Sequence, residues 1–195
     1  MKTDVIIIGG SYAGISAALQ LARARRSITV IDTGQRRNRF ASHSHGFLGR
    51  DGHAASAIAE EARQQLLAYP TVRWIEGEAT HAAVHTQGFD VQVNGHAESA
   101  SRLVLASGVV DELPDIEGLR ERWGRSVFHC PYCHGYELNQ GAIGVLANNE
   151  MAMHQAQLLP EWGPVTLLLN GSFTPDATQQ ALLARRHVKV EHARV

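Results

Sequence analysis

The chain has 195 residues, 44% of them hydrophobic, and a formal net charge of -1. This length allows one full α/β domain and a partial second one, but not two complete ones. The hydrophobic content is enough for a buried core and excludes a disordered or fibrous protein. The basic residues are scattered, and apolar stretches such as 5–8 are far shorter than the ~20 residues that span a bilayer. We therefore expect neither nucleic-acid nor membrane binding.

The N-terminus and the cysteines bear on the cellular compartment. The sequence begins Met-Lys-Thr-Asp and leads directly into a β-branched run, without the pattern of a secretory leader, so we expect a cytoplasmic protein. Its two cysteines are Cys130 and Cys133. In a reducing compartment, such a Cys-x-x-Cys pair indicates redox or metal chemistry before it indicates a structural disulfide.

The first thirty residues predict a βαβ unit. Residues 4–8 form an apolar, β-branched run typical of a buried strand, and the glycine-rich segment 9–14 predicts a tight turn. Residues 15–26 have helical apolar spacing, and 28–31 predict a second strand that ends at Asp32.

The middle of the chain alternates between an open loop and short elements. Residues 33–52 are glycine-rich and basic, which predicts an irregular ligand-binding loop, and 53–67 predict an amphipathic helix that stops before Pro70. Short strands separated by Gly and Asn turns follow, and they predict a small antiparallel excursion that returns to the main sheet. They cover residues 72–77, 82–86, 89–93 and 102–106.

A Pro- and Gly-punctuated segment at 113–118 predicts a domain boundary. We expect a first domain over 1–112 and a partial second domain over 118–195. The second domain repeats the strand, helix and strand order, and it is expected to stop shortly after its second strand. These three elements are predicted at 143–146, 148–159 and 164–169. The predicted fold class is α/β, with a Rossmann-like parallel sheet, an antiparallel excursion and a partial second Rossmann-like domain.

The turn at Gly9–Gly14 is close to the dinucleotide-binding fingerprint Gly-x-Gly-x-x-Gly, with Ser11 in place of the second glycine. The helix that follows presents free N–H groups to an anion. Asp32 stands where an acidic residue can accept a hydrogen bond from a ribose hydroxyl. The alternative interpretation is a glycine turn that binds nothing.

The second unit lacks this fingerprint. Aligning the two units with a constant shift pairs Gly9 with Ala147, Ser11 with Asn149, Gly14 with Ala152 and Asp32 with Asn170. Without the glycines and the acidic residue, NADP binding is hard to justify, and we interpret the unit as a nucleotide domain that kept its fold and lost its ligand. The alternative is an unusual NADPH site.

The chemical centre is the segment 129–137, His-Cys-Pro-Tyr-Cys-His-Gly-Tyr-Glu. Two cysteines this close can share a disulfide, and neighbouring imidazoles favour a thiolate near neutral pH, so the segment predicts thiol–disulfide exchange. The open alternatives are c-type haem attachment, half of a zinc site, a glutaredoxin-like motif and two inert thiols. We predict no metal site. His43 and His45 lie in the glycine-rich loop and are either ligand-binding or structural.

These motifs together resemble the low-molecular-weight thioredoxin reductase family. The resemblance rests on the N-terminal fingerprint, on Ala106-Ser107-Gly108 at a strand end and on the Cys-x-x-Cys pair. More narrowly, Arg39-Phe40 and the segments 45–49 and 130–137 are similar to flavin-dependent dithiol oxidases, which close disulfides in small natural products. In the reductases an aspartate follows the second cysteine, where this chain has His134.

The resemblance implies a set of FAD contacts and three catalytic residues. It places the FAD pyrophosphate at Gly9–Gly14, the adenosine ribose on Asp32 and the adenine near Ala79, and it places Arg39–Ser42 and His45 on the flavin side. The implied FAD-binding residues are Gly9, Ser11, Tyr12, Ala13, Gly14, Asp32, Arg39, Phe40, Ala41, Ser42, His45, Ala79, Ala106, Ser107 and Gly108. Cys133 is then the sulfur that faces the flavin, Cys130 the interchange thiol and His134 the general acid/base.

The resulting hypothesis is an FAD-dependent thiol–disulfide oxidoreductase that oxidises a dithiol with O₂. The substrate is a small dithiol or a thioredoxin-like protein, and a homodimer is expected. One alternative is an NADPH-dependent disulfide reductase. The other is a non-catalytic fragment, because the family's flavin domain is closed by a returning Gly-Asp segment that this sequence does not reach before Val195.

Overall fold

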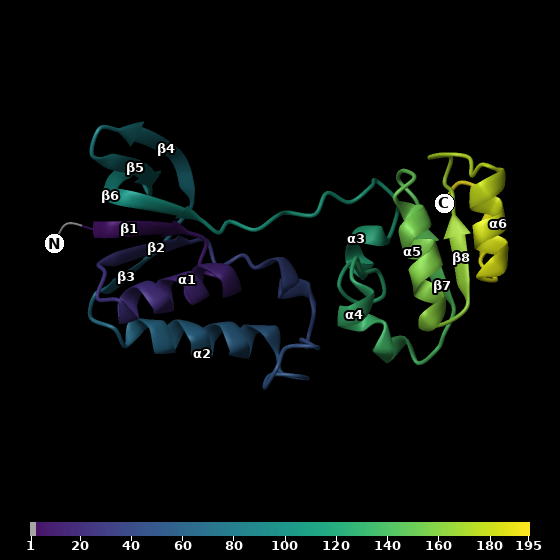
Figure 1. Cartoon of the computed structure of the whole chain (residues 1–195), viewed down its shortest axis with the longest axis horizontal. Helices are drawn as coiled ribbons and strands as arrows, with labels where there is room; N and C mark the ends of the chain where they lie inside the picture. The colour runs from purple at the N-terminus through teal and green to yellow at the C-terminus, as the bar shows by residue number, and fades with distance from the viewer. Residues whose placement is uncertain (1–2) are drawn as a thin grey trace. The chain divides into compact units, whose positions relative to one another are not determined.

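The computed structural model describes residues 3–195, so the first two residues of the predicted first domain lie outside it. The described chain divides into two compact units, each built on its own sheet (Figure 1). The first unit runs up to Ser44 and continues over Gly52–Glu112, and the second contains His45–Asp51 and Leu113–Val195. Within residues 3–195, no helix is both long enough and apolar enough to span a bilayer.

The first unit has one mixed six-stranded sheet in the order β3-β2-β1-β6-β5-β4. Its strands are β1 (Thr3–Ile8), β2 (Ile28–Asp32), β3 (Val72–Glu76), β4 (Ala79–His85), β5 (Gly88–Val93) and β6 (His96–Leu105). β1 pairs in parallel with both β2 and β6, whereas β5 pairs antiparallel with β4 and β6. β6 is therefore shared between the parallel sheet and the antiparallel excursion.

The central strand β1 is buried on both faces, which explains its uninterrupted apolar sequence. Val5 and Ile7 face a core that includes residues of α1 (Tyr12–Arg23) and α2 (Ala55–Leu67). Both helices lie on the same face of the sheet in Figure 1. Ile6 points the other way, into a core with Val91 and Val93 of β5. The excursion thus covers the face that the helices leave open.

The predicted α/β fold with an antiparallel excursion is confirmed, but the assignment of one strand is wrong. The strand predicted at 72–77 is β3, and it pairs in parallel with β2 rather than joining the excursion. A short apolar run carries no signal for the direction of its partner, so the sequence pattern could not separate the two cases. A short 3₁₀ helix, η1 (Arg37–Phe40), also lies in the loop that was predicted to be irregular.

The second unit has a parallel sheet in the order β7-β8-β9, the same succession as β1-β2-β3. Its strands are β7 (Ile143–Leu146), β8 (Val165–Leu168) and β9 (Lys189–Glu191). The helices α5 (Ala152–Leu158) and α6 (Ala177–Arg185) contribute Met153, Ala156 and Leu183 to its core. The short helices of this unit are α3 (Leu119–Arg122), α4 (Pro131–His134), η2 (Tyr136–Leu138) and η3 (Leu159–Glu161).

The prediction that this unit stops shortly after its second strand is wrong, because α6 and β9 follow and extend the sheet to three strands. The start of α6 could have been predicted from Asp176 and Gln179. The Asp176 side chain accepts from the Gln179 backbone N–H at 2.8 Å, and the Gln179 side chain accepts from the Asp176 N–H at 2.8 Å. This is a capping box, a sequence signature of a helix start. β9 has only three residues and is mostly exposed, so it shows little apolar pattern.

Candidate active site

The carboxyl ends of β1 and β6 lie side by side where the strand order of the first sheet changes direction. The Ala106 N–H donates to the Ile8 carbonyl at 2.7 Å, so the segment Ala106-Ser107-Gly108 begins next to the Gly9–Gly14 turn. In open α/β sheets, ligands bind outside the carboxyl ends of the strands at such a switch point. The structure thus brings together two of the sequence motifs predicted to bind FAD.

The glycines of this turn are required by close packing. Gly9 has a φ of +103°, and a Cβ atom there would lie 2.2 Å from the Ala106 carbonyl oxygen. A Cβ at Gly14 would lie 1.8 Å from the Gly9 carbonyl oxygen, and one at Gly10 would lie 2.2 Å from the Trp74 ring. A side chain at any of these three positions would clash with the chain itself, so the close packing of the turn requires glycine.

The start of α1 has the properties of an anion site. Ser11 is the N-cap residue in an extended conformation, and its side chain makes no capping hydrogen bond to the helix. The first turn carries no acidic residue. The helix N-terminus therefore retains N–H donors and the positive end of its dipole for a negative group such as a pyrophosphate.

Asp32 lies at the end of β2, directly beside this turn. Its Oδ1 accepts from the Gly10 N–H at 2.8 Å, and its Oδ2 accepts from the Gly34 N–H at 3.0 Å. Each carboxylate oxygen has a second lone pair, so a ribose hydroxyl can still donate to it. The Asp32 carbonyl also accepts from Gly77 N–H at 3.0 Å, which places the start of β4, at Ala79, close to this strand end. The glycine turn, the helix start and this carboxylate fit the adenosine diphosphate part of FAD.

The loop after Asp32 is anchored by contacts that sequence reasoning missed. The Asn38 side chain donates to the Tyr12 hydroxyl at 3.1 Å. Arg37 donates from Nε and Nη2 to the Asp111 carboxylate, with an Nε–Oδ2 distance of 2.9 Å, and this fork raises the pKa of the guanidinium. Arg39 lies over the Phe40 ring, 4.3 Å from its centroid. The predicted residues Arg39–Ser42 are thus held in a loop that is attached at Asp111.

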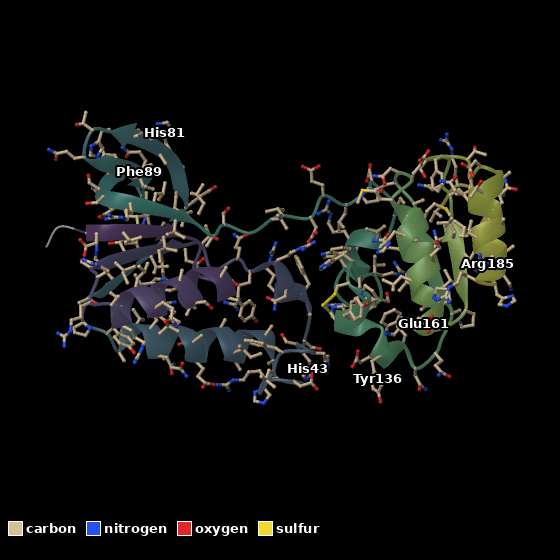
Figure 2. The ribbon with its side chains drawn as sticks, viewed as in Figure 1. His43, His81, Phe89, Tyr136, Glu161 and Arg185 are labelled. Carbon is tan, nitrogen blue, oxygen red and sulfur yellow. A yellow bond between two sulfur atoms is a disulfide. The ribbon has the colours of Figure 1, made fainter. Side chains whose placement is uncertain are left out.

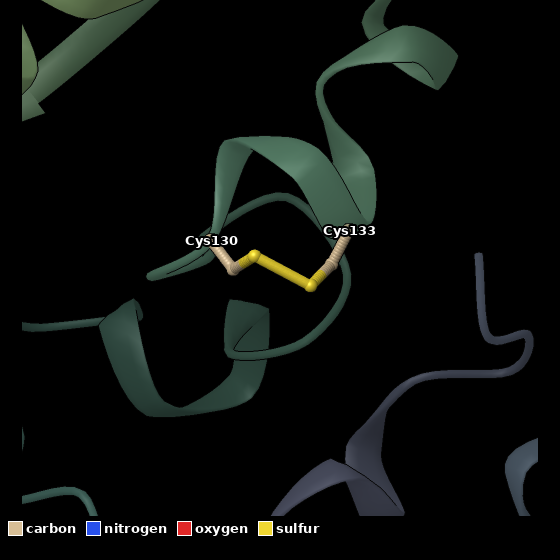
Figure 3. The surroundings of a disulfide bond; sticks show 2 residues. All are labelled: Cys130 and Cys133. Carbon is tan, nitrogen blue, oxygen red and sulfur yellow. A yellow bond between two sulfur atoms is a disulfide. The ribbon is translucent and has the colours of Figure 1, made fainter. Parts of the chain in front are cut away.

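The predicted Cys130–Cys133 pair forms a disulfide in the second unit (Figure 3). The two Cα atoms are 5.4 Å apart. Cys130 is the N-cap residue of α4, and Pro131 occupies the first helical position, where a missing N–H costs nothing. Within residues 3–195, no group of three or more His, Cys, Asp or Glu side chains is placed to hold a metal ion.

Two aromatic side chains from outside the disulfide helix pack against rings on it. The His134 ring stacks on Phe128 with centroids 4.3 Å apart, and Tyr132 meets Trp162 edge to face at 5.3 Å. Gly135 is required next to Trp162, because a Cβ there would lie 2.5 Å from the indole Cδ1. These contacts fix the segment that carries the cysteines.

His134 has a perturbed protonation equilibrium. Burial lowers the pKa of His134 below its usual 6.5, the Glu137 carboxylate opposes this, and His129 and His45 lower the pKa further. The imidazole is therefore neutral at pH 7 and can accept a proton. This agrees with the general acid/base role that the sequence resemblance implies.

His45 lies in the second unit, on the segment His45–Asp51. Its Nε2 is 3.5 Å from Oε1 of Glu137, and its Nδ1 is 3.5 Å from Oδ1 of Asp51. Neither carboxylate was a predicted site residue. No local pattern links His45 to Glu137, which is far away in sequence, whereas Asp51 lies only six residues from His45. His43 is exposed and contacts the Ser42 hydroxyl at 2.9 Å (labelled in Figure 2).

The strand–turn–helix start of the second unit differs from that of the first. The Ala147 N–H donates to Leu168 O at 2.9 Å, as Gly9 N–H donates to Ile31 O at 2.8 Å. The counterpart of Asp32 is therefore Leu169, which is buried, and the predicted alignment of Asp32 with Asn170 is wrong by one residue. The connection to the second strand is one residue shorter here, so a constant shift cannot match both strand ends.

In the turn of the second unit, a side chain forms a hydrogen bond with a backbone N–H group of the same turn. Asn149 Oδ1 accepts from the Met151 N–H at 2.8 Å, and α5 begins only at Ala152. A backbone donor that a phosphate would need is thus already occupied. The unit keeps the βαβ framework without the ligand-binding features.

Comparison with known proteins decides the family. The family model of the pyridine nucleotide-disulphide oxidoreductases matches residues 3–156. The chain belongs to this family. It is 38% identical over 179 residues to thioredoxin reductase tcpT of Claviceps purpurea, covering 87% of this chain and 56% of that protein. It is also 35% identical over 186 residues to thioredoxin reductase sirT of Leptosphaeria maculans, covering 86% and 56%.

Solved structures of similar proteins agree with this family. An oxidoreductase from Agrobacterium tumefaciens matches with a TM-score of 0.95 and 61% identity, over 100% of this chain and 66% of that one. The crystal structure of HlmI matches with a TM-score of 0.94 and 40% identity, over 100% and 62%. The fold is thus that of thioredoxin reductase-like proteins. The chain spans about half the length of the curated relatives named above.

Proposed function

We propose that this chain is the dithiol-handling part of an FAD-dependent thiol–disulfide oxidoreductase that oxidises a substrate dithiol, with O₂ as the final electron acceptor. The observation that carries this proposal is the Cys130–Cys133 disulfide, followed directly by His134, whose pKa is lowered by burial, in a member of a disulfide oxidoreductase family. The net reaction converts a dithiol and O₂ into a disulfide and hydrogen peroxide. Two electrons and two protons pass from the sulfurs to oxygen.

The exchange step uses the two cysteines in different roles. A substrate thiolate attacks Sγ of Cys130, the Cys130–Cys133 bond breaks, and Cys133 leaves as a thiolate. The second substrate thiol then attacks the substrate sulfur of the mixed disulfide, which closes the substrate disulfide and releases Cys130 as a thiolate. His134 accepts a proton from an attacking thiol, because its lowered pKa keeps it neutral at pH 7.

The nucleotide site of the first unit is proposed to hold FAD. The α1 N-terminus would hold the pyrophosphate, Asp32 would accept from the ribose, and Ala106–Gly108, beside the glycine turn, would supply further contacts. When bound, FAD supplies a two-electron acceptor for the reduced cysteines. Arg39–Ser42 and the backbone near Ala79 complete the proposed set of contacts.

Oxygen is favoured over NADPH by the second unit. In its turn the Met151 N–H donates to the Asn149 side chain, and the buried Leu169 stands where the first unit has an acidic residue at the strand end. The alternative is an NADPH-dependent disulfide reductase, which the names of the relatives favour. A thioredoxin-like protein would then be the partner, in place of a small dithiol. We further propose that the active form is a homodimer in the cytoplasm.

The test is the absorption spectrum of the purified chain with added FAD. A small dithiol such as dithiothreitol should bleach the flavin without oxygen, and air should restore the colour. Cys130→Ser should bind FAD equally well and bleach at least about a hundredfold more slowly, because the interchange thiol is missing. A chain that binds no FAD, or bleaching that is unchanged in Cys130→Ser, contradicts the proposal. Bleaching by NADPH in place of the dithiol supports the reductase alternative.

A further inference from the structure

The Glu137 carboxylate, just after the Cys-x-x-Cys segment, contacts the imidazole of His45 and acts electrostatically on that of His134. Glu137 follows His134 by three positions, and its Oε1 lies 3.5 Å from Nε2 of His45. His45 is held from its other side by Asp51, whose Oδ1 lies 3.5 Å from Nδ1 of His45 and also accepts from the Gly46 N–H at 2.8 Å. The short segment 45–51 thus contacts the segment that follows the Cys-x-x-Cys pair.

Three titratable side chains from different segments act on the pKa of His134. Glu137 acts from the following helix η2, His129 from the residue before Cys130, and His45 from the loop segment 45–51. Glu137 favours the protonated imidazole, whereas the two histidines disfavour it. The ring of His134 is stacked on Phe128, and that of His129 on Trp123, so both are held by packing as well as by charge.

We propose that Glu137 is a positioning residue that holds the imidazoles of His45 and His134 together as a two-site proton acceptor for the cysteine pair. This inference rests on the proposed function, because only a dithiol reaction delivers protons at this place. Each substrate dithiol gives up two protons together with its two electrons. His134 takes the first proton from a thiol, and His45 takes the next or passes it to solvent, to which its side chain is partly exposed.

In this scheme the Glu137 carboxylate stabilises the protonated form of the two imidazoles. An imidazolium at either histidine is attracted to the negative charge of Glu137, and this offsets the repulsion between two protonated rings. Proton transfer breaks one S–H bond and forms one N–H bond, and no other bond changes. Glu137 itself contacts neither substrate nor sulfur in this scheme, so its effect is transmitted through the two imidazoles.

The first test is an NMR titration of the His134 ring in the intact chain, which does not require flavin. Glu137→Gln keeps the shape but removes the charge, so the pKa of His134 should fall below the wild-type value. His45→Gln removes one of the imidazoles that lower the pKa of His134, so the pKa of His134 should rise. If Glu137 were merely structural, its loss would expose His134 to water and raise the pKa toward 6.5, the opposite direction.

The controls keep the test decisive. Glu150→Gln removes an exposed carboxylate from the same unit and should leave the His134 titration unchanged. Glu137→Asp keeps the charge but shortens the side chain, so its effect should have the same sign as Glu137→Gln and be smaller. Should Glu137→Gln not fold, Glu137→Asp decides. A His134 pKa that is unchanged or raised in the Glu137 variants overturns the inference.

A kinetic readout separates this inference from the proposed function. The rate at which dithiothreitol reduces the Cys130–Cys133 disulfide can be followed by alkylation without any flavin. The acid limb of its pH profile should move to lower pH in Glu137→Gln and to higher pH in His45→Gln, with a several-fold lower plateau in both. Unchanged profiles contradict the role of Glu137 even if FAD is bound and bleached. Shifted profiles in a chain that binds no FAD would contradict only the proposed function.

Discussion

The two strand–turn–helix segments of this chain share a framework and differ in their turns. Both join the first strand to the second by the same backbone hydrogen bond, from Gly9 to Ile31 and from Ala147 to Leu168. The first turn is packed so closely that it requires glycine at positions 9, 10 and 14, and its helix start has no side-chain cap. The second turn closes on itself through Asn149. The βαβ framework therefore depends on apolar strands and helix packing, whereas ligand binding depends on a few turn residues.

The largest expected effect comes from adding a methyl group to the first turn. Gly14→Ala places a Cβ 1.8 Å from the Gly9 carbonyl oxygen, so the helix start must move. We expect a loss of about 3 kcal/mol or more of stability and no FAD binding, measured by thermal unfolding and by bound flavin absorbance. The matched change in the second unit, Ala152→Gly, should cost only about 1 kcal/mol. Equal effects at the two positions would contradict the distinction between the turns.

The second prediction concerns the acidic residue at the strand end. In the wild type, the two Asp32 oxygens accept from the Gly10 and Gly34 N–H groups. Asp32→Asn replaces one of these oxygens with an NH₂ group, which must then face one of the two N–H donors. We expect FAD affinity to fall about 10- to 100-fold, the equivalent of losing one hydrogen bond to a charged group. Equilibrium dialysis with FAD measures this. Leu169→Asn, at the equivalent place in the second unit, should leave FAD affinity unchanged.

The smallest expected effects come from the two polar turn residues. Asn149→Gly removes the hydrogen bond to the Met151 N–H and should lower the free energy of unfolding by about 1 kcal/mol. Ser11→Gly removes no capping hydrogen bond and restores the full glycine fingerprint, so it should change stability by only a few tenths of a kcal/mol. Denaturant unfolding monitors both. A larger loss in Ser11→Gly than in Asn149→Gly would show that the serine side chain, and not the asparagine, supports its turn.

Much of the fold could be predicted because its signals are local. The strand, glycine turn and helix at the N-terminus follow from residue types within a single βαβ unit, and the family resemblance follows from short motifs. The Cys130–Cys133 pair could be predicted for the same reason. The alignment of the two units was wrong by one residue at the second strand. The connection before that strand is one residue shorter in the second unit, so the counterpart of Asp32 is Leu169 and not Asn170. A constant shift along the sequence cannot detect such a deletion.

The contacts around the disulfide could be predicted only in part. His134 is adjacent to Cys133 in the sequence, so its proximity is certain. The approach of His45 to Glu137 joins a loop after the first βαβ unit to a segment beyond the boundary at 113–118, and no residue pattern encodes that distance. The same limit applies to Arg37 and Asp111, whose ion pair depends on where β6 ends.

The double role of β6 has a consequence for synthesis on the ribosome. β1 is translated well before β6 (His96–Leu105), which is one of its two neighbours in the sheet. Contacts between such distant segments form slowly, because the intervening chain must first be closed into a loop. Until Leu105 has been translated, one edge of β1 carries unpaired backbone groups, a template for aggregation. The nascent first unit is therefore expected to be most exposed to aggregation and most dependent on chaperones during that interval.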